Sequence, residues 1–586
     1  MIELITSDTI IREEIIPELA KFDVLGLDIE CRGTNPRESE MLTIQLSSQS
    51  DTWVFDTRRV NLAPVFELLK QTNPLIIGHN LKFDISFLQY NYGYVPSRIF
   101  DTMIAYGIIN NGIENPFVSL KHLVELYSDQ TLNKELRDSF RYTYADLTDE
   151  QVRYAARDVE VLWSVFDAEL EQLNRDDLIE TAKLEFDIIP VVVDMELMGV
   201  KLDKDKWVEA AARLAREASN IEKYIVEIVG GQVLQSSFLD TPAYNVNPRS
   251  PKQMLEAFRK LGFNIENTQA DTLSKIEHPL AQALTKYRTK SKLASTYGVN
   301  FLDKIESDGR IHAEFNQQGT VSGRFACSKP NLENIPADPF YRSCFVAEDG
   351  SMLITADYDQ VELKIAAIMS NEIAMLEEYK KFGSDLHRLT ASRILRIPME
   401  EVQEDQRDNV GKSCNFGVMY GISEYGLLRR FGISLDEGRF LIDGFGKAYP
   451  TLTSYMLEQG QLALRDGYNT TKIGRRRYYE LPSLGSREYG KNIARIRREA
   501  ANQRIQGTGA DIMKQAMVNV HNQAVCYSAH IVNTVHDELV VECPIKYTSK
   551  LLPIVREQME LAGRQIMGDA LEWSVSIGVG GSWKKV

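Results

Sequence analysis

Residues 351–364 read SMLITADYDQVELK, an apolar run that ends in acidic residues and then becomes helical in pattern. We expect a buried strand over Ser351–Ala356 that delivers Asp357 and Tyr358, followed by a helix from Gln360. An aspartate at the end of a buried strand is costly unless a partner compensates its charge. The stretch therefore predicts a strand that presents Asp357 to such a partner.

A second acidic stretch, residues 530–542 (HIVNTVHDELVVE), predicts a β-hairpin with Asp537 at its tip. If the two strands are neighbours, Asp357 and Asp537 can hold paired metal ions about 3.5–4 Å apart, as in phosphoryl transfer. The alternative is an ordinary hairpin with an aspartate in its turn.

Residues 407–421 (RDNVGKSCNFGVMYG) lie between these acids and predict a helix. Lys412, Phe416 and Tyr420 recur at every fourth position, so an ammonium and two rings would share one stripe. A cation suits a triphosphate, and a ring suits a base or a sugar. The alternative is a core stripe, although core stripes rarely include lysine.

The front of the chain carries a separate acidic pattern. Phe22–Glu30 alternates at period two, so a strand there places Asp28 and Glu30 on one face. Two carboxylates at such a short separation resist ionisation unless a cation lies between them. The pair therefore favours a hard divalent metal. The alternative is an exposed strand edge.

Two later segments extend this pattern. Residues 74–80 predict a short buried strand and a polar turn, after which a helix carries Asp84 as a third ligand. Residues 148–151 fit a capping box, and the helix that they start places Tyr154 and Asp158 four residues apart on one side. A tyrosine hydroxyl beside a carboxylate can orient a water molecule for attack.

Length and composition limit the number of domains and the class of protein. A chain of 586 residues with 44% apolar content exceeds what one core supports and predicts at least two domains. With no signal sequence and no apolar run near about 18 residues, we expect a soluble, cytoplasmic protein that is neither secreted nor in a membrane. Six scattered cysteines indicate neither disulfides nor a zinc site.

The net charge of −16 is divided unevenly. Residues 1–180 hold 31 acidic and 16 basic side chains, whereas the remaining residues hold 52 and 51. Clusters such as Arg475–Arg477 and Arg495–Arg498 can then form a local positive surface against phosphates. The alternative for either cluster is a solvated helix face.

The three front segments, in this order and spacing, resemble the DEDD superfamily of 3′→5′ exonucleases, in the subclass with tyrosine in the third motif. The resemblance implies a ribonuclease-H-like fold with a mixed sheet flanked by helices. It also implies that two Mg²⁺ or Mn²⁺ ions are held by Asp28, Glu30, Asp84 and Asp158, with Tyr154 positioning the nucleophile.

The later segments, together with Thr320–Arg324, Asn331–Pro336 and Gln506–Asp511, resemble the family A DNA polymerases over essentially the whole chain. The implied architecture is α/β (α+β), with an exonuclease domain over 1–175 and a right-hand polymerase domain over 176–586. We expect the thumb at about 202–306, the palm at about 307–370 and 480–586, and the fingers at about 371–479.

The polymerase resemblance implies roles residue by residue. Asp357, Asp537 and the Tyr358 carbonyl would hold two Mg²⁺ ions, and Lys412 would assist the pyrophosphate leaving group. The implied nucleotide-binding residues are Gln360, Glu362, His387, Arg407, Lys412, Phe416 and Tyr420. Among these, Glu362 would exclude a ribose 2′-OH, and phenylalanine at 416 would disfavour dideoxynucleotides.

Candidate DNA contacts fall into two groups. Arg324, Asn502, Gln506 and His536 are expected to donate to minor-groove acceptors that every correct base pair presents. The thumb helix would present Arg288, Lys292 and Thr296 to phosphates, and Arg475 is a further expected contact.

Three departures from the family pattern stand out. Arg407 precedes Lys412 by five residues, whereas family members usually have this arginine four residues before the lysine. Asp408 occupies that position here. Asp359 and Lys364 replace the commoner Ser and Arg, which adds negative charge and removes a bidentate donor. The thumb has no long insertion, so a processivity factor is not supported and a monomer is expected.

We therefore expect a DNA-dependent DNA polymerase with a proofreading 3′→5′ exonuclease, acting on primer-template DNA and dNTPs in a bacterium or a phage-infected cell. A second interpretation is an exonuclease whose C-terminal half mainly grips DNA. A third is a non-catalytic nucleic-acid-binding scaffold.

Overall fold

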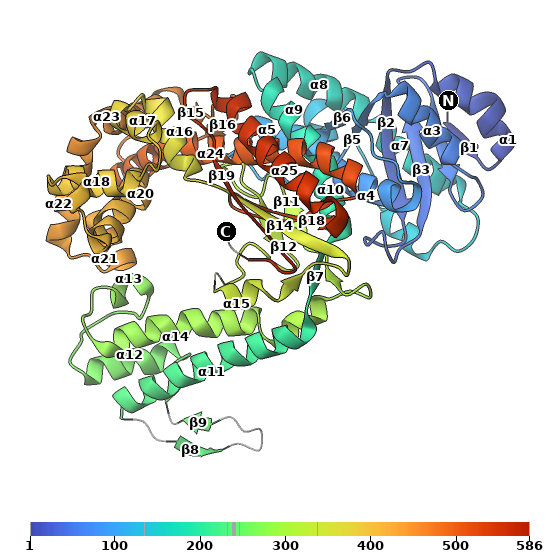
Figure 1. The fold of residues 1–586 in the computed structure, drawn as a ribbon. Coiled ribbons are helices and arrows are strands. Elements are labelled where there is room, and N and C mark those ends of the chain that lie inside the picture. Colours follow the sequence, from blue (N-terminus) through green and yellow to red (C-terminus); the bar gives the residue numbers. More distant parts are fainter. Residues whose placement is uncertain are drawn as a thin grey trace.

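The computed structural model describes residues 2–133, 135–230, 233–236, 242–244, 246–336 and 338–584. Figure 1 shows a front domain at the right, a central sheet, a helical lobe at the left and a long helical arm at the bottom. The chain contains both helices and strands, as the expected mixed α/β class requires.

The front domain is built on a six-stranded mixed sheet of order β1-β4-β3-β2-β5-β6. Its strands are β1 (Ile2–Ile5), β2 (Val24–Cys31), β3 (Met41–Ser47), β4 (Thr52–Asp56), β5 (Leu75–Gly78) and β6 (Ile99–Asp101). The flanking helices include α3 (Ala63–Thr72), α4 (Leu81–Tyr92), α5 (Thr102–Ile109), α7 (Asp149–Glu160) and α8 (Leu162–Arg175). The predicted strands at 22–30 and 74–80 and the helices that follow the acidic motifs are confirmed.

Two helices, α9 (Ile179–Asp187) and α10 (Ile189–Met198), connect the front domain to the rest. Ile189 and Val193 of α10 belong to the front core, whereas Val191 and Val192 belong to the core of the back half. One helix thus contributes to both apolar interiors, because its buried residues face two directions.

The central sheet is antiparallel, with the order β17-β18-β14-β19. Its strands are β14 (Ser351–Tyr358), β17 (His530–Val535), β18 (Glu538–Pro544) and β19 (Val575–Gly580), so the predicted strand and hairpin are confirmed. The helices α24 (Tyr489–Ala524) and α25 (Ile545–Met567) pack against it, and α16 (Val361–Ser370) packs against α24.

The left lobe in Figure 1 contains α17 (Ile373–Tyr379), α18 (Leu386–Leu395), α20 (Ser413–Phe416), α21 (Glu424–Phe431), α22 (Leu435–Ala448) and α23 (Pro450–Asp466). The lower arm contains α11 (Lys204–Ile228), α12 (Pro251–Lys260), α13 (Ala270–Leu273) and α14 (Pro279–Thr296), which share a separate small core. An ion pair between Asp271 and Arg429 joins the tip of the arm to α21.

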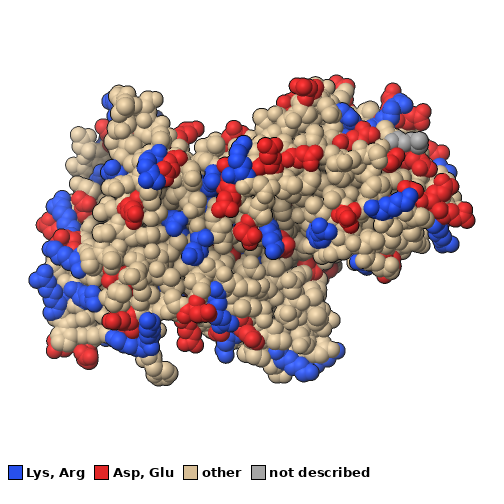
Figure 2. Space-filling view, turned by 90° about the horizontal axis from the view of Figure 1, so that it is seen from above, with Lys and Arg blue, Asp and Glu red and all other residues tan. Residues whose placement is uncertain are grey.

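Figure 2 shows acidic side chains gathered over the front domain at the right and basic ones more frequent over the lobe at the left, in keeping with the uneven charge of the sequence. Among the described residues, no helix combines the length and the apolar character needed to cross a membrane.

Two candidate active sites

The front acidic cluster joins β2 to α7. Carboxylate oxygens of Asp28, Glu30 and Asp158 all lie within 4.8 Å of one another. β2 presents the first two because residues two apart share a strand face, and α7 packs against β2 and β3 to add the third. Carboxylates this close repel one another unless a cation intervenes, so the donor set fits a hard divalent ion.

Asp84 lies near this cluster at the start of α4. Its Oδ1 accepts a hydrogen bond from the main-chain N–H of Ile29 over 3.1 Å. Burial, followed by the charge of Asp28, raises the pKa of Asp84 well above its usual range. A nearby cation would relieve this penalty, so Asp84 fits the same centre.

Tyr154 precedes Asp158 by one turn of α7, which begins with the predicted capping box of Thr148 and Gln151. Burial, followed by the charge of Asp158, raises the pKa of Tyr154. The hydroxyl therefore keeps its proton at neutral pH and can donate it in a hydrogen bond.

The second acidic pair lies at one end of the central sheet. Asp357 is paired across β14 and β18 with Glu538, the residue after Asp537. The main-chain N–H of Tyr358 donates to the carbonyl oxygen of Asp537 over 3.3 Å. Segments far apart in the sequence thus bring Asp357 and Asp537 to neighbouring positions, as the two-metal hypothesis requires.

Glu538 has a different role from these two acids. It is buried, its Oε2 accepts a hydrogen bond from Arg342 over 2.7 Å, and its Oε1 accepts one from the Trp583 indole over 2.7 Å. Because both oxygens are engaged, Glu538 anchors the hairpin beside Asp537.

A pocket beside this pair gathers the residues expected around a nucleotide. Its lining includes Gln360, Glu362, Phe416, Tyr420 and Asp537. Glu362 forms an ion pair with Arg324, and burial raises the pKa of Glu362. A second pocket is lined in part by Arg324 and His536.

Asn502 and Gln506 lie one turn apart on α24, and both are partly exposed. The Asn502 amide donates to the Tyr420 carbonyl over 3.3 Å. This bond connects the expected minor-groove readers to the pocket beside Asp537.

His387 is held by a buried amide that the sequence reasoning missed. Asn415 Nδ2 lies 2.9 Å from His387 Nδ1, and Asn415 Oδ1 accepts a hydrogen bond from the Thr390 hydroxyl over 3.0 Å. Burial, with a contribution from Arg407, lowers the pKa of His387 to about 4. An amide donor at Nδ1 places the imidazole proton on Nε2. Asn415 lies within the motif that carries Lys412, but nothing in a single sequence distinguishes it from a core amide.

The predicted continuous helix over 407–421 is wrong beyond Phe416. A π-helical turn spans Arg407–Lys412, α20 ends at Phe416, and a 3₁₀ turn covers Val418–Tyr420. A Cβ on Gly417 would lie 2.6 Å from the carbonyl oxygen of Ser413, so the chain passes there at a distance that only glycine allows.

Arg475 is buried rather than exposed. Its Nε donates to Asp511 over 2.7 Å, and its Nη1 lies 2.6 Å from Glu185, which also pairs with Lys514. Arg475 is thus almost fully buried, and its guanidinium is engaged by carboxylates rather than presented to a phosphate. Its role is to compensate buried carboxylates.

The expected thumb contacts lie on α14. Lys292 and Thr296 are exposed, whereas the Arg288 guanidinium donates to Thr268 Oγ1 over 2.8 Å.

The two unusual residues after Asp357 face the end of β19, where Asp359 accepts from Ser576 over 2.6 Å and Lys364 donates to Ser574 over 2.8 Å.

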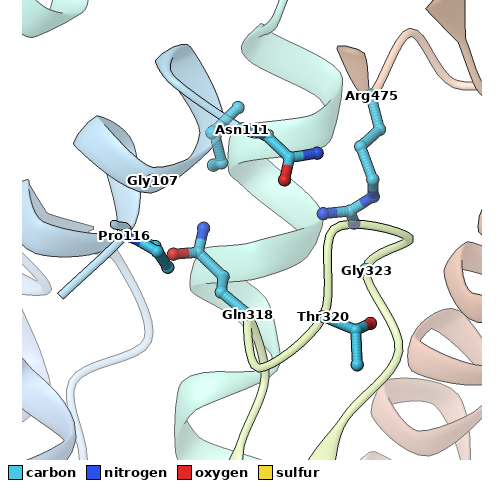
Figure 3. A pocket seen from close by; sticks show the side chains of 8 residues that line it. Gly107, Asn111, Pro116, Gln318, Thr320, Gly323 and Arg475 are labelled. Carbon is cyan, nitrogen blue, oxygen red and sulfur yellow. The ribbon is translucent and has the colours of Figure 1, made fainter. Parts of the chain in front are cut away.

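A seam of contacts between the front domain and the back half was not predicted, and Figure 3 shows it. Asn111 donates to the carbonyl oxygens of Val321 and Arg476 over 3.0 and 2.7 Å, and Gln318 donates to that of Ile104 over 2.9 Å. The front domain therefore supports the loop that carries Arg324.

The family model for DNA polymerase family A matches residues 204–585. The chain belongs to the family A DNA polymerases. A second model, 3′-5′ exonuclease, matches residues 4–174, so this family A member carries an exonuclease domain at its front, in agreement with the predicted fold class.

Similar proteins agree with this placement. DNA polymerase I of Chloroflexus aurantiacus is 30% identical over 613 residues, which cover 99% of this chain and 63% of that protein. DNA polymerase I of Aquifex aeolicus is 30% identical over 601 residues, 95% of each chain. A solved structure described as the POL domain of Pol1 from M. smegmatis in complex with DNA primer-template and dNTP has a TM-score of 0.81, 27% identity and 97% coverage of both chains. The chain thus spans 63% of the first relative and nearly all of the second.

Proposed function

We propose that the protein is a template-directed DNA polymerase that also removes nucleotides from the 3′ end of the strand it extends. The observation that carries this proposal is the adjacency of Asp357 and Asp537, made by the Tyr358 N–H bond to the Asp537 carbonyl. The pocket beside them contains Glu362, Phe416 and Tyr420, residues suited to a sugar and a base.

At the synthetic centre, Asp357, Asp537 and the Tyr358 carbonyl would hold two Mg²⁺ ions, with Mn²⁺ as a substitute. Such ions, when bound, favour ionisation of the primer 3′-OH and stabilise charge on the leaving pyrophosphate. Arg407, Lys412 and the Nε2–H of His387 would bind the triphosphate, and Lys412 is suited to neutralise the pyrophosphate as it leaves.

Substrate selection follows from the pocket walls. Glu362 fills the space beside the sugar and is fixed by Arg324, so a ribose 2′-OH would meet a buried carboxylate. Gln360 accepts from the Tyr379 hydroxyl over 2.9 Å, which fixes the neighbouring wall. Phe416 and Tyr420 would pack against the sugar and the templating pair.

At the exonuclease centre, Asp28, Glu30, Asp84 and Asp158 would hold a second pair of Mg²⁺ ions. Tyr154 would orient the attacking water by donating or accepting a hydrogen bond. Double-stranded primer-template would contact Arg324, Asn502, Gln506 and His536, with Lys292 and Thr296 on phosphates. We propose that the protein acts as a monomer and without a processivity factor.

Primer extension and strand degradation by Asp537→Ala and Asp28→Ala test the two-centre proposal. Asp537→Ala should abolish synthesis and retain degradation, and Asp28→Ala should do the reverse. Each variant controls the folding of the other. Loss of both activities in either variant would contradict two independent centres.

A further inference from the structure

Asp408 lies between the two cations assigned to the triphosphate. Its Oδ1 is 2.7 Å from Lys412 Nζ and 3.2 Å from Arg407 Nη1. The Asp408 side chain is 52% exposed, and Lys412 is 41% exposed, so solvent and ligands reach this contact.

The π-helical turn explains how Arg407 and Lys412 reach the same carboxylate. In an α-helix, residues five apart point about 140° away from each other. In a π-helical turn the hydrogen bonds join residues five apart, so the extra residue is absorbed and Arg407 returns to the side of Lys412.

The turn is seated tightly on α18. A Cβ on Gly411 would lie 2.0 Å from the His387 carbonyl oxygen, so glycine allows the close approach. Arg407 is fixed from that side, because its Nε donates to Asp385 Oδ2 over 2.6 Å, and Asp385 caps the N-terminus of α18. Arg407 and Lys412 therefore both contact Asp408, and His387 lies on the part of α18 against which Gly411 packs.

A carboxylate and a phosphate group accept the same hydrogen bonds from lysine and arginine. We propose that Asp408 is an internal competitor of the triphosphate: its carboxylate occupies Lys412 and Arg407 until an incoming dNTP displaces it, and it returns when pyrophosphate leaves. This role rests on the proposed polymerase function. It makes Asp408 a positioning residue that weakens the binding of both the substrate and the pyrophosphate product.

The test compares Asp408→Asn with Asp405→Asn, which removes the same charge three residues earlier. Asp408→Asn should lower the KM for dNTP by roughly two- to fivefold, the range that loss of one exposed ion pair gives. The inhibition constant for inorganic pyrophosphate should fall by a similar factor, and kcat should stay within about twofold when chemistry is limiting. Asp408→Glu, which keeps the charge, should resemble the wild type.

Both constants should be measured at low and high salt, because screening of the exposed contact should reduce the difference between Asp408→Asn and the wild type. An unchanged or raised KM in Asp408→Asn, or an equal decrease in Asp405→Asn, would overturn the role of Asp408. Absence of primer extension by the wild type would instead defeat the proposed function.

Discussion

The N–H of Tyr358 and the carbonyl oxygen of Asp537 form a 3.3 Å hydrogen bond that closes the register between β14 and the hairpin tip. Next to it, Asp357 is paired with Glu538 across the sheet. The position of both acids therefore depends on how firmly Glu538 is held.

Arg342→Met should remove the buried cation that compensates Glu538 and destabilise the protein by about 3–5 kcal/mol. Urea unfolding followed by circular dichroism measures this loss. Adding Glu538→Gln should recover a substantial part of it, because the uncompensated charge is then absent. Equal stability of the single and double variants would show that the charge is not the cause.

Asn415→Leu should weaken nucleotide binding more than chemistry. Without the amide donor at Nδ1, the imidazole of His387 is free to place its proton on either nitrogen, and the Nε2 donor is no longer fixed. We expect the KM for dNTP to rise by roughly three- to tenfold, equivalent to one lost hydrogen bond. Nitrogen NMR of His387 reports the tautomer directly, and an unchanged tautomer would contradict the mechanism.

The lowered pKa of His387 predicts a pH dependence of stability. The folded value is about 4 and the ordinary value is 6.5, so the unfolded chain binds the proton first as the pH falls. Above pH 6.5 the titration of His387 does not change the free energy of unfolding. As the pH falls from 6.5 toward 4, the protein progressively loses stability. Urea unfolding at pH 7 and pH 5 gives the free energy of unfolding at each pH. The difference between the two values should be smaller for His387→Gln than for the wild type.

Asn111→Ala should weaken the contacts along the seam between the front domain and the back half. The change removes the hydrogen bonds to the Val321 and Arg476 carbonyls, which should lower the free energy of unfolding by about 1–3 kcal/mol. Because Arg324 follows Val321 closely, the affinity for primer-template should also fall in a fluorescence anisotropy titration. Asn110→Ala is the matched control, since the Asn110 amide bonds within its own helix to Tyr106. The same loss in both variants would argue against the seam.

Gly411→Ala should abolish nucleotide binding while leaving degradation intact. The added methyl group would overlap the His387 carbonyl oxygen and push the π-helical turn off α18. Equilibrium dNTP binding measures the effect, with Gly446→Ala as a control because its nearest side-chain atom would lie 3.9 Å from the new Cβ. Normal dNTP affinity in Gly411→Ala would show that the close approach is not required.

Local patterns in the sequence predicted the parts of the fold that depend on neighbours along the chain. The strand before Asp357, the strand carrying Asp28 and the capping box at Thr148 follow from periodicity and short-range hydrogen bonding. Each places an acid at the end of an element or on a defined face, which is why the acidic residues could be named.

Tertiary partners could not be predicted in this way. Three consecutive arginines suggested one surface, yet Arg475 pairs with Glu185 and Asp511, Arg476 with Asp176, and Arg477 with Glu499. These acids are distant in sequence, and nothing local reveals which cation each one meets. The π-helical turn was equally hidden, because its register depends on the packing of Gly411 against α18.

The hydrogen bonds of Asn111 and the shared packing of α10 bear on how a DNA end would move between the two proposed centres. They join the front domain to the back half through hydrogen bonds and a shared helix, so a swing of one centre toward the other would have to break these contacts. If the chain has both proposed activities, a mispaired primer end is expected to fray from its template and cross the interval between the centres on its own. On this proposal the nucleic acid, rather than a hinge between domains, is the part that moves.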